Sequence, residues 1–574
     1  MRNGLPVWRL IYNQESRLIS FNMVGPIIIL ATLLPVAYYI YIGLRKDSRA
    51  DSLDDFFIYN RKVNAKDFAN TTVGYSLQMA ALFLFADWGI RYGFGALWVP
   101  IFWGLGFFLL YLAIPKFDYF ISQNWTLHGY LKNRFNSKAL QWVAAIATII
   151  GLWGTMMVEI DYATAIYQPF FSTKLSLFML GMVFLAFGFV YIALGGYKAE
   201  VNTERVQVPV AYAALLFIIL SLVLNVYFKG HTQAFWILNG FLFLCFVFMI
   251  KAKAGIVPGK PFADKQLLIP IIGIILQLFL MTIALLSHPT SPNEVAISSL
   301  LANPLDQLRA QGIISLLSLF FANALWQFVD LSSWQRVSSV KLSDANDSSR
   351  YEPIRRGVWR VMVESPVSWV FGVIFGMTLK YSGFLNANDD PSVAIGNFVT
   401  ALSTRKVSIA FFGSYSWLLY PVLVAAVIAI MLSTVHALIC AVSFTAMNDL
   451  QPIRARTLNR ARIWTFLIVL MGGVLYYILR FVSEAGIATA LYAFYASQLS
   501  LFPTVVASFY SKYVNKYAAL TSIVTGIVTA FVFAYSVVEK YPSLSLAPPL
   551  FSLIVSGVVY LVVSFFARKH EGVT

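Results

Sequence analysis

Charged side chains are scarce in this chain, because Asp, Glu, Lys and Arg together make up only 12% of its 574 residues. A soluble domain needs far more charge to cover its surface, and here 59% of the residues are hydrophobic. The composition therefore excludes an ordinary soluble protein and indicates a polytopic membrane protein. Acidic residues are scarcer than basic ones, which leaves a formal net charge of +16. Nucleic-acid binding would need a basic face, whereas these residues lie in short loops between apolar runs, so we expect no nucleic-acid partner.

Cysteine is nearly absent, and the two that occur, Cys245 and Cys440, both lie inside apolar runs. They are too few for a disulfide framework and too isolated for a transition-metal site. No P-loop, HExxH, GxSxG or CxxC pattern occurs anywhere in the sequence. The chain therefore has no catalytic constellation, and we expect neither an enzyme, nor a bound cofactor, nor a nucleotide as its energy source.

Long apolar runs dominate the sequence, and each is long enough to cross a bilayer, which takes about 17 residues or more. The first run is followed directly by Arg45 and Lys46, whereas a signal peptide carries its charge before a shorter apolar core. This run is therefore a retained transmembrane helix. The sequence predicts about fifteen transmembrane helices, at approximately 23–44, 68–89, 94–114, 140–166, 175–194, 206–228, 233–250, 268–287, 312–334, 360–383, 416–448, 462–482, 486–509, 517–538 and 547–567.

The loops between these runs indicate the orientation of the chain. If the N-terminus lies outside, the loops that fall on the inner side hold most of the Lys and Arg residues, and this bias persists to the last loop. One miscounted helix would reverse the bias from that point onward. We therefore expect a multi-pass protein of the plasma (cell inner) membrane, with the N-terminus outside and the C-terminus inside.

Polar motifs recur at loops and helix ends, and six of them are DDFFIYNRKVNAKDF (Asp54–Phe68), WTLHGYLKNRFNSKAL (Trp125–Leu140), GGYKAEVNTERVQ (Gly195–Gln207), DLSSWQRVSSVK (Asp330–Lys341), MLSTVHALICAVSFTAMNDL (Met431–Leu450) and SLFPTVVASFYSKYVNKYAALTSIVTG (Ser500–Gly526). Together they resemble motifs of the sodium:solute symporter family, in that family's order, over more than four-fifths of the chain. One departure is Glu204, which stands where the family usually has Asp.

The resemblance implies the leucine-transporter architecture, with two five-helix inverted repeats around a site near the middle of the bilayer. An independent pointer is a pair of interrupted helices at matching places, VGYSLQM (Val73–Met79) and ANALWQFVD (Ala322–Asp330). The expected divisions are a peripheral helix and cytoplasmic loop at 1–67, repeat one at 68–228, an inserted helix pair with an outer loop at 229–311, repeat two at 312–509 and two C-terminal helices at 510–574. The family normally has only a loop where the inserted pair lies.

Ser433 and Thr434 place two hydroxyl groups in the middle of an apolar run. Such hydroxyls often bond back to their own helix or pack against a neighbouring helix. A hydroxyl pair opposite a predicted helix break also suits sodium, because hard cations prefer several oxygen ligands. The resemblance implies a sodium site made of these two hydroxyls and backbone oxygens of Gly74, Leu77 and Ile430.

A second sodium site in some family members uses the acid that corresponds to Glu204, together with hydroxyls just after the pair. Here those later positions are His436 and Ala437, so we expect one sodium site. Glu204 and His436 remain possible coupling residues. His436 lies one turn from Ser433, so its protonation would disfavour a nearby cation, although a lone buried His is more often a packing residue.

The solute site implied by the resemblance draws on several core helices, and its candidate residues are Gln78, Glu159, Trp326, Gln327, Asp330, Tyr495 and Gln498. This set combines aromatic rings, amides and two acids, which suits a zwitterionic or cationic solute and does not exclude a sugar. Carboxylates inside a membrane line a water-filled cavity or find a charged partner. Asp87, Glu159 and Asp161 are accordingly either an acidic outer vestibule or parts of structural ion pairs.

These observations predict a secondary active transporter that imports a small organic solute by sodium symport through alternating access. A proton-coupled symporter of the same fold is one alternative, and a transporter-like solute sensor is another. After Phe566 the chain ends in ARKHEGVT, too short for an output domain, so a sensor would need a partner protein. The expected partners are the solute, a sodium ion and the bilayer, and the oligomeric state stays open.

Overall fold

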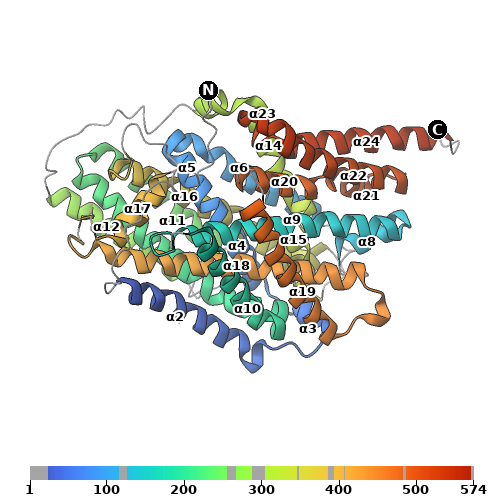
Figure 1. The fold of residues 1–574 in the computed structure, drawn as a ribbon, viewed down its shortest axis with the longest axis horizontal. Helices are drawn as coiled ribbons and strands as arrows, with labels where there is room; N and C mark the ends of the chain where they lie inside the picture. Colours follow the sequence, from blue (N-terminus) through green and yellow to red (C-terminus); the bar gives the residue numbers. More distant parts are fainter. Residues whose placement is uncertain are drawn as a thin grey trace.

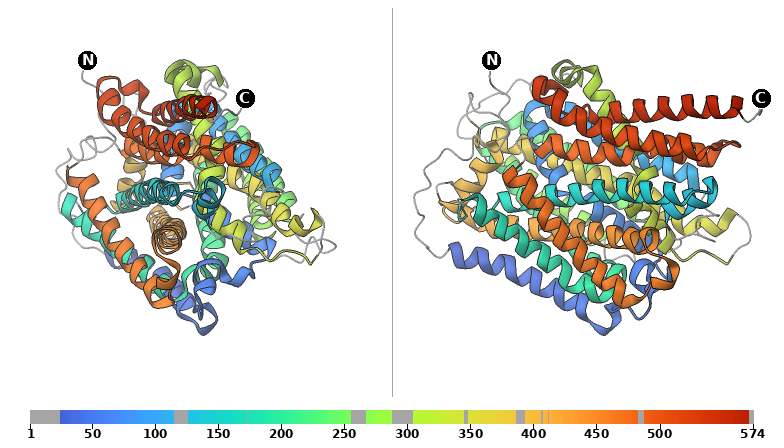
Figure 2. Two further views of the ribbon diagram at one scale, coloured as in Figure 1. Left: turned by 90° about the vertical axis from the view of Figure 1, so that its right-hand side faces the viewer. Right: turned by 45° about the vertical axis from the view of Figure 1, so that its right-hand side comes forward.

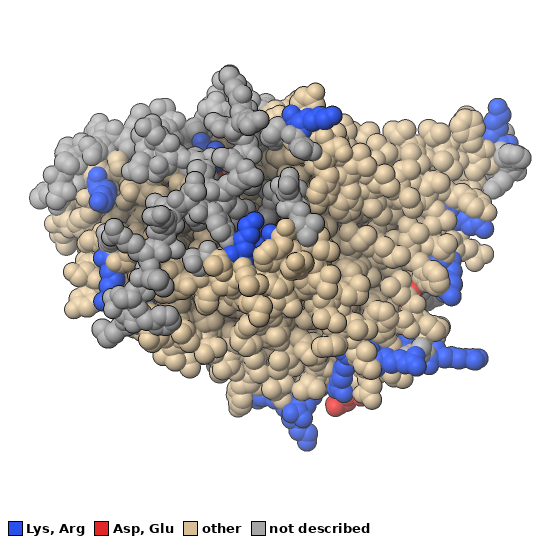
Figure 3. Space-filling view, in the orientation of Figure 1, with Lys and Arg blue, Asp and Glu red and all other residues tan. Residues whose placement is uncertain are grey.

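The computed structural model describes residues 24–114, 126–171, 173–254, 267–287, 304–344, 348–385, 393–405, 407–410, 412–482 and 487–570. Within these ranges the chain is helical, and β structure is limited to two isolated bridges. Most helices run along the long axis of the molecule (Figure 1). In the face shown, Lys and Arg side chains gather mainly at the right-hand end and the lower right edge, and uncharged residues cover much of the remaining described surface (Figure 3). This arrangement suits a protein whose middle lies in lipid.

The helices are α2 (Val24–Leu44), α3 (Leu53–Ile58), α4 (Ala65–Ser76), α5 (Met79–Tyr92), α6 (Trp98–Ala113), α8 (Leu127–Phe135), α9 (Lys138–Ala165), α10 (Lys174–Phe228), α11 (Thr232–Ala254), α12 (Leu268–Leu286), α14 (Pro304–Val329), α15 (Leu331–Ser339), α16 (Glu352–Tyr381), α17 (Ala394–Ser403), α18 (Leu419–Thr445), α19 (Leu458–Tyr477), α20 (Ile487–Leu499), α21 (Phe502–Tyr510), α22 (Lys516–Val532), α23 (Val538–Lys540) and α24 (Pro548–His570). Each predicted span corresponds to one helix, half of α10 or a pair of helices in line. The all-α membrane fold is therefore confirmed.

Thirteen continuous helical stretches in the described residues are long and apolar enough to cross a membrane. Two of them, Met79–Ala113 and Lys174–Phe228, each extend over more than one predicted span. The longer one turns back at Gly196, whose φ is +55°. Its two halves meet where the Gln207 side-chain amide donates to the Tyr191 hydroxyl at 3.4 Å. In a straight helix these residues would be about 24 Å apart, so α10 makes two crossings.

Helix α18 lies at the centre of the molecule, and 89% of its most apolar stretch is buried, against 22% for α12. Other helices surround it in the end-on view of Figure 2. It packs most extensively against α10 and also touches α9 and α2. The helix that carries Ser433 and Thr434 is thus surrounded by protein rather than by lipid.

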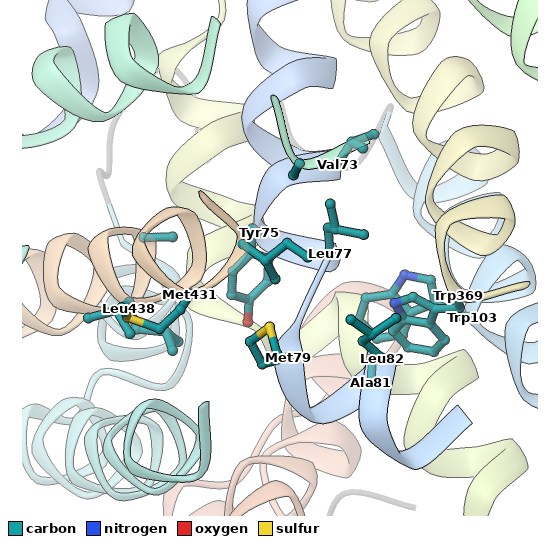
Figure 4. Packing of buried hydrophobic residues seen from close by; sticks show 14 of the residues in the cluster. Val73, Tyr75, Leu77, Met79, Ala81, Leu82, Trp103, Trp369, Met431 and Leu438 are labelled. Atoms are coloured by element: carbon teal, nitrogen blue, oxygen red, sulfur yellow. The ribbon is translucent and has the colours of Figure 1, made fainter. Parts of the chain in front are cut away.

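Two helices are interrupted, at both places where the sequence predicts a break. Helix α4 ends at Ser76 and α5 begins at Met79, with Leu77 and Gln78 in non-helical conformations. Helix α14 ends at Val329, and Asp330 (φ −72°, ψ 108°) separates it from α15. Figure 4 shows the first break at Leu77, with Tyr75 and Met79 on the side that faces Met431 of α18. Backbone groups freed at such breaks must find partners inside the protein.

One half of each broken helix, α4 and α15, is joined to the other through backbone hydrogen bonds next to the helices. The Val63 N–H donates to the Ser339 carbonyl at 3.1 Å, and the Lys341 N–H donates to the Val63 carbonyl at 2.8 Å. Val63 lies just before α4, and the other two residues lie at the end of α15. These bonds tie α4 and α15 into one unit on one side of the breaks.

The inserted pair, α11 and α12, does not stand apart from the core. Helix α11 packs against α16 and α10, and α12 packs outside it. Lys253 near the end of α11 lies 2.8 Å from a carboxylate oxygen of Glu364 in α16, and both side chains are almost fully buried. Glu364 also accepts from Arg360 at 2.5 Å, and Arg360 in turn donates to Asn70 of α4 at 2.7 Å. The insertion is therefore linked by buried charges to the first broken helix.

Candidate functional site

Three elements meet at Gly74, Glu204 and Ser433, which we call the carboxylate cluster. The Ser433 hydroxyl in α18 donates to Oε1 of Glu204 in the second half of α10, at 2.5 Å. Both side chains are buried, with Glu204 at 0% and Ser433 at 2% exposure. The other carboxylate oxygen, Oε2, has no hydrogen-bond partner among the described residues. An acceptor of this kind, buried and unpaired, is costly unless a ligand or a proton satisfies it.

Gly74 forms the third side of the carboxylate cluster, in the last turn of α4 before the break. A Cβ at this position would lie 2.2 Å from Glu204 Oε2 and 2.7 Å from the Ser433 hydroxyl oxygen. Only glycine leaves room for these oxygens, which is one reason why α4 tolerates a residue that weakens helices. The sequence predicts Gly74 and Ser433 in one site, and the structure brings them together.

Of the other three predicted sodium-binding positions, Thr434 and Ile430 are joined by a local hydrogen bond, whereas Leu77 is bonded through its N–H and not through the carbonyl that the prediction assigns to the ion. The Thr434 hydroxyl donates to the Ile430 carbonyl at 3.2 Å, the back-bond that buried hydroxyls in helices commonly make. The Leu77 N–H donates to the carbonyls of Val73 at 2.9 Å and Gly74 at 3.2 Å, which closes the last turn of α4. Glu204, expected from the sequence only as a possible coupling residue, is instead the centre of the cluster.

His436 lies one turn beyond Ser433 and is fully buried. Its ring packs edge-on against Tyr191, with the ring centroids 4.2 Å apart, and lies over Gly188. Neither ring nitrogen has a hydrogen-bond partner within the part of the chain that the structure describes. The geometry is that of a packing residue between α18 and the first half of α10.

Both helix breaks are capped by a buried carboxylate. Glu159 of α9 accepts from the N–H groups of Met79 at 2.6 Å and Ala80 at 3.1 Å, the first two residues of α5. Asp330 accepts from the N–H groups of Ser332 at 3.1 Å and Ser333 at 3.0 Å, at the start of α15. An anion at a helix N-terminus is stabilised by the unsatisfied N–H groups and by the helix dipole.

These caps change the interpretation of the predicted solute site. Glu159 and Asp330 were expected to make the site acidic. In the structure their carboxylate oxygens accept hydrogen bonds from the N–H groups at the starts of α5 and α15. Asp330 also accepts from the Tyr75 hydroxyl at 3.3 Å and from the Ser333 hydroxyl at 2.8 Å. Because both carboxylates are committed to the caps, their charge no longer favours a cationic or zwitterionic solute over a neutral one.

An aromatic and amide cluster lies beside the first break. The Tyr495 hydroxyl in α20 donates to the Gln78 side-chain oxygen at 3.1 Å. The Trp326 ring of α14 packs against the Tyr495 ring with centroids 4.3 Å apart. The structure thus brings together three predicted residues from α14, α20 and the break between α4 and α5.

The two remaining amides make different contacts. The Gln327 side-chain oxygen accepts from the Ser333 hydroxyl at 3.0 Å, and its buried amide nitrogen has no partner among the described residues. Gln498 turns toward α9, where its amide donates to the Thr148 carbonyl at 3.1 Å and covers Gly151. Gln498 therefore joins α20 to α9.

The other intramembrane carboxylates form ion pairs. Asp87 pairs with Arg91 one turn away at 2.9 Å. Asp161 pairs with Arg480 and also accepts from the Tyr476 hydroxyl at 3.2 Å. Of the two interpretations that the sequence left open, the structure favours structural ion pairs over an acidic vestibule.

One buried pair was not singled out from the sequence. The Arg336 guanidinium in α15 donates to Glu200 of α10 at 2.8 Å, and both are about 1% exposed. It also lies over the Tyr75 ring, 4.8 Å from the centroid. Glu200 is one turn before Glu204, so the four-residue spacing of two acids in the GGYKAEVNTERVQ motif was the available signal. The pair holds α15 against α10, one helical turn from Glu204 along α10.

Comparison with known proteins supports the fold. A solved structure of a sodium-coupled sialic acid symporter, in a substrate-bound outward-open state, matches with a TM-score of 0.61 and 12% sequence identity, covering 94% of this chain and 98% of that one. The chain has the leucine-transporter-like fold. A structure of a nucleobase-cation-symport-1 family transporter in a closed conformation, with bromovinylhydantoin bound, matches with a TM-score of 0.47 and 11% identity over 92% and 96% of the two chains. No protein-family model and no curated protein sequence matches the chain.

The leucine-transporter-like fold accounts for where the described clusters lie. Gly74 and Gln78 lie at the first helix break, and Trp326 lies in the helix that ends at the second. At 12% identity the match concerns architecture alone. The resemblance to the sodium:solute symporter family therefore stays a prediction from the motifs.

Proposed function

We propose that the chain is a secondary active transporter that moves a small organic solute across the membrane by alternating access, coupled to a sodium ion. The observation that carries the proposal is the meeting of Glu204 and Ser433 at Gly74, directly before the break of a discontinuous helix. In this architecture, ions and solute bind beside such breaks, and one bundle of helices moves against the rest around them.

The carboxylate cluster fits a hard cation in its donor chemistry. It offers a carboxylate and a hydroxyl, and the end of α4 adds main-chain carbonyls, all of them oxygen ligands of the kind that hard cations prefer. The unpartnered Oε2 of Glu204 is a buried negative atom that a cation would neutralise. We assign Gly74, Ser433 and Glu204 to the ion, with Leu77, Ile430 and Thr434 as neighbouring candidates.

The solute would bind at the aromatic and amide cluster. Trp326 and Tyr495 offer ring faces from two helices, and Gln78 offers an amide at the break itself. Because Gln78 is only four residues from Gly74, a rearrangement of the break would change both the carboxylate cluster and the aromatic and amide cluster. That closeness is the physical basis for coupling the two ligands.

Closure on one side would depend on α4 and α15. The start of α4 and the end of α15 are joined by the backbone hydrogen bond between Val63 and Lys341. Arg336 of α15 is also paired with Glu200 of α10. Opening that side requires the Arg336–Glu200 pair to separate or to move as a unit with α10. The break at Asp330 lets α15 move without α14.

A proton is the second candidate for the coupling ion. The observation that favours it is the same unpartnered oxygen of Glu204, because a buried carboxyl without a cation is satisfied by a proton. Sodium and proton coupling would then use one site, and the two are separated by experiment. A solute sensor of the same fold would bind ligands without net uptake.

The test is solute uptake into proteoliposomes with an imposed sodium gradient, a proton gradient or none, using pools of amino acids, sugars and organic cations. Ser433→Ala is compared with Ser443→Ala, which removes a buried hydroxyl of the same helix that only bonds back to Ile439 at 2.7 Å. Sodium-driven uptake that Ser433→Ala alone weakens supports the proposal. Uptake that follows only the proton gradient supports the second candidate, and binding without uptake under any gradient refutes transport.

A further inference from the structure

A groove of about 930 Å³ runs along the outside of the bundle between α14, α21 and α24, away from the carboxylate cluster. Its walls are mostly apolar and include Phe321 and Leu325 of α14, Val506 of α21, and Leu553 and Leu561 of α24. Leu561 is 69% exposed. The volume falls in the range of about 300–1,000 Å³ found for sites that hold small organic ligands.

One end of the groove is polar and basic. Arg568, in the last turn of α24, lines it and places its guanidinium over the Tyr513 ring, 4.7 Å from the centroid. This end lies on the side where α24 ends and where Lys and Arg side chains gather (Figures 1 and 3). No acidic residue occurs among the described residues that line the groove. The charge of Arg568 therefore faces the groove without a carboxylate from its walls.

Two further polar side chains, Tyr560 and Ser564, line the groove. The hydroxyls of Tyr560 and Ser564, one turn apart on α24, are buried and interact with each other, and neither makes a well-aligned hydrogen bond with any other described residue. Both residues line the groove and are more than nine-tenths buried. In an apolar wall, such donors are costly unless an acceptor lies in the groove.

We propose that this groove binds an anionic phospholipid, with an acyl chain between α14, α21 and α24 and the phosphate at Arg568. The shape and polarity fit a chain that is apolar along most of its length and anionic at one end. A guanidinium makes paired hydrogen bonds to phosphate, and the ester oxygens of a lipid would accept from the Tyr560 and Ser564 hydroxyls. Basic residues near a membrane surface select anionic headgroups in this way.

The proposal concerns the outer surface of the bundle and does not depend on transport activity. A second copy of the chain is the other possible occupant of an apolar groove. The basic end with no acid in the described lining favours the lipid, since a second copy would bring its own Arg568 rather than an anion. Native mass spectrometry detects both a bound lipid and a dimer, so it distinguishes the two occupants.

The experiment is native mass spectrometry of the detergent-purified full chain, titrated with phosphatidylglycerol or phosphatidylcholine. Arg568→Gln is compared with Lys569→Gln, which removes the same charge one residue away from a side chain that does not line the groove. Gly557→Leu fills the groove, and its Cβ meets only Pro503, at 3.9 Å, so the backbone need not move. A size-exclusion profile like that of the unmodified chain shows that each variant is folded.

The expected result is that phosphatidylglycerol binds more tightly than phosphatidylcholine. Arg568→Gln weakens it about fivefold, the effect of one basic residue beside an anionic headgroup. Lys569→Gln leaves its affinity within about twofold, because this side chain does not line the groove and its exposed charge is largely screened from a headgroup held there, and Gly557→Leu weakens both lipids. Equal affinity for the two lipids, or equal effects of the two charge variants, would overturn the proposal. A dimer that Gly557→Leu dissociates, with lipid binding unchanged, would replace it with a subunit interface.

Discussion

The Ser433 hydroxyl donates to the Glu204 carboxylate at 2.5 Å, although the two residues are 229 positions apart in the chain. This contact joins the central helix α18 to the second half of α10 at the point where α4 ends. It leaves Glu204 with one satisfied oxygen and one unsatisfied oxygen, both fully enclosed. The predictions about coupling follow from that asymmetry.

Replacing the carboxylate by an amide separates charge from shape. Glu204→Gln keeps an oxygen that can accept from Ser433 but removes the negative charge, so sodium loses a charged ligand. An interaction of that kind contributes about 1.5–3 kcal/mol, and the half-saturating sodium concentration for uptake should rise by about tenfold or more. Glu352→Gln, in an exposed pair with Arg356, is the matched control. An unchanged sodium dependence in Glu204→Gln would remove Glu204 from the ion site.

Gly74 is expected to tolerate no side chain. In Gly74→Ala the new Cβ would lie 2.2 Å from the Glu204 carboxylate, so α4 or α10 must shift. Overpacking of this kind costs about 1–3 kcal/mol, and the midpoint of thermal denaturation in detergent should fall. Gly240→Ala in α11 is the control, because no described atom lies within 4 Å of its Cβ. Equal midpoints for the two variants would show that the cluster is looser than described.

Removing one partner of the Arg336–Glu200 pair should lower the stability of the protein strongly, whereas replacing both partners should change it little. Removing one partner of a buried pair leaves an uncompensated charge and costs about 3–5 kcal/mol, whereas replacing both by apolar residues is often nearly neutral. Arg336→Met should therefore lower the thermal midpoint strongly, and Arg336→Met with Glu200→Met should recover much of it. Arg356→Met breaks only an exposed pair, worth about 0–1 kcal/mol. If the double variant is no better than the single one, Arg336 is held by its other contacts instead.

Loss of Lys253 should lower the thermal stability of the protein less than loss of Arg360. Lys253→Met leaves Glu364 paired with Arg360 at 2.5 Å. Arg360→Met leaves Glu364 with Lys253 alone and also frees Asn70 of α4. Thermal midpoints should therefore fall further for Arg360→Met than for Lys253→Met. The reverse order would mean that α11 contributes more than Arg360 to holding Glu364.

If the aromatic and amide cluster binds the solute, a substitution there should change the solute KM and leave the half-saturating sodium concentration nearly unchanged. Tyr495→Phe removes the hydrogen bond to Gln78 and keeps the ring contact with Trp326. A neutral hydrogen bond contributes about 0.5–1.5 kcal/mol, so the solute KM should rise severalfold while the half-saturating sodium concentration stays within about twofold. Tyr535→Phe, on an exposed part of the chain, should change neither. A change in the sodium constant alone would place Tyr495 with the ion rather than the solute.

The membrane helices and the two helix breaks were readable from the sequence because their causes are local. Apolar runs of spanning length need only their own residues to be recognised, and every predicted run corresponds to helical structure. The break near Leu77 follows Gly74 and Ser76 in the chain, and the break at Asp330 coincides with the residue that caps the next helix. The sequence also predicts two separate crossings at 175–194 and 206–228, and the structure places the turn between them at Gly196.

The partners of the buried polar groups were decided only by the tertiary structure. The sequence by itself determined that Glu159, Glu204 and Asp330 lie in or beside apolar helices, and that Ser433 sits in mid-membrane. Packing of helices far apart in the chain then decided that Glu159 caps α5 and that Glu204 meets Ser433 rather than Arg336. A buried carboxylate must be satisfied by whatever donor lies within about 3 Å, and that distance depends on the rotation and approach of two helices. Periodicity along one helix carries no information about its neighbour's rotation, so the composition of the site appears only in the folded chain.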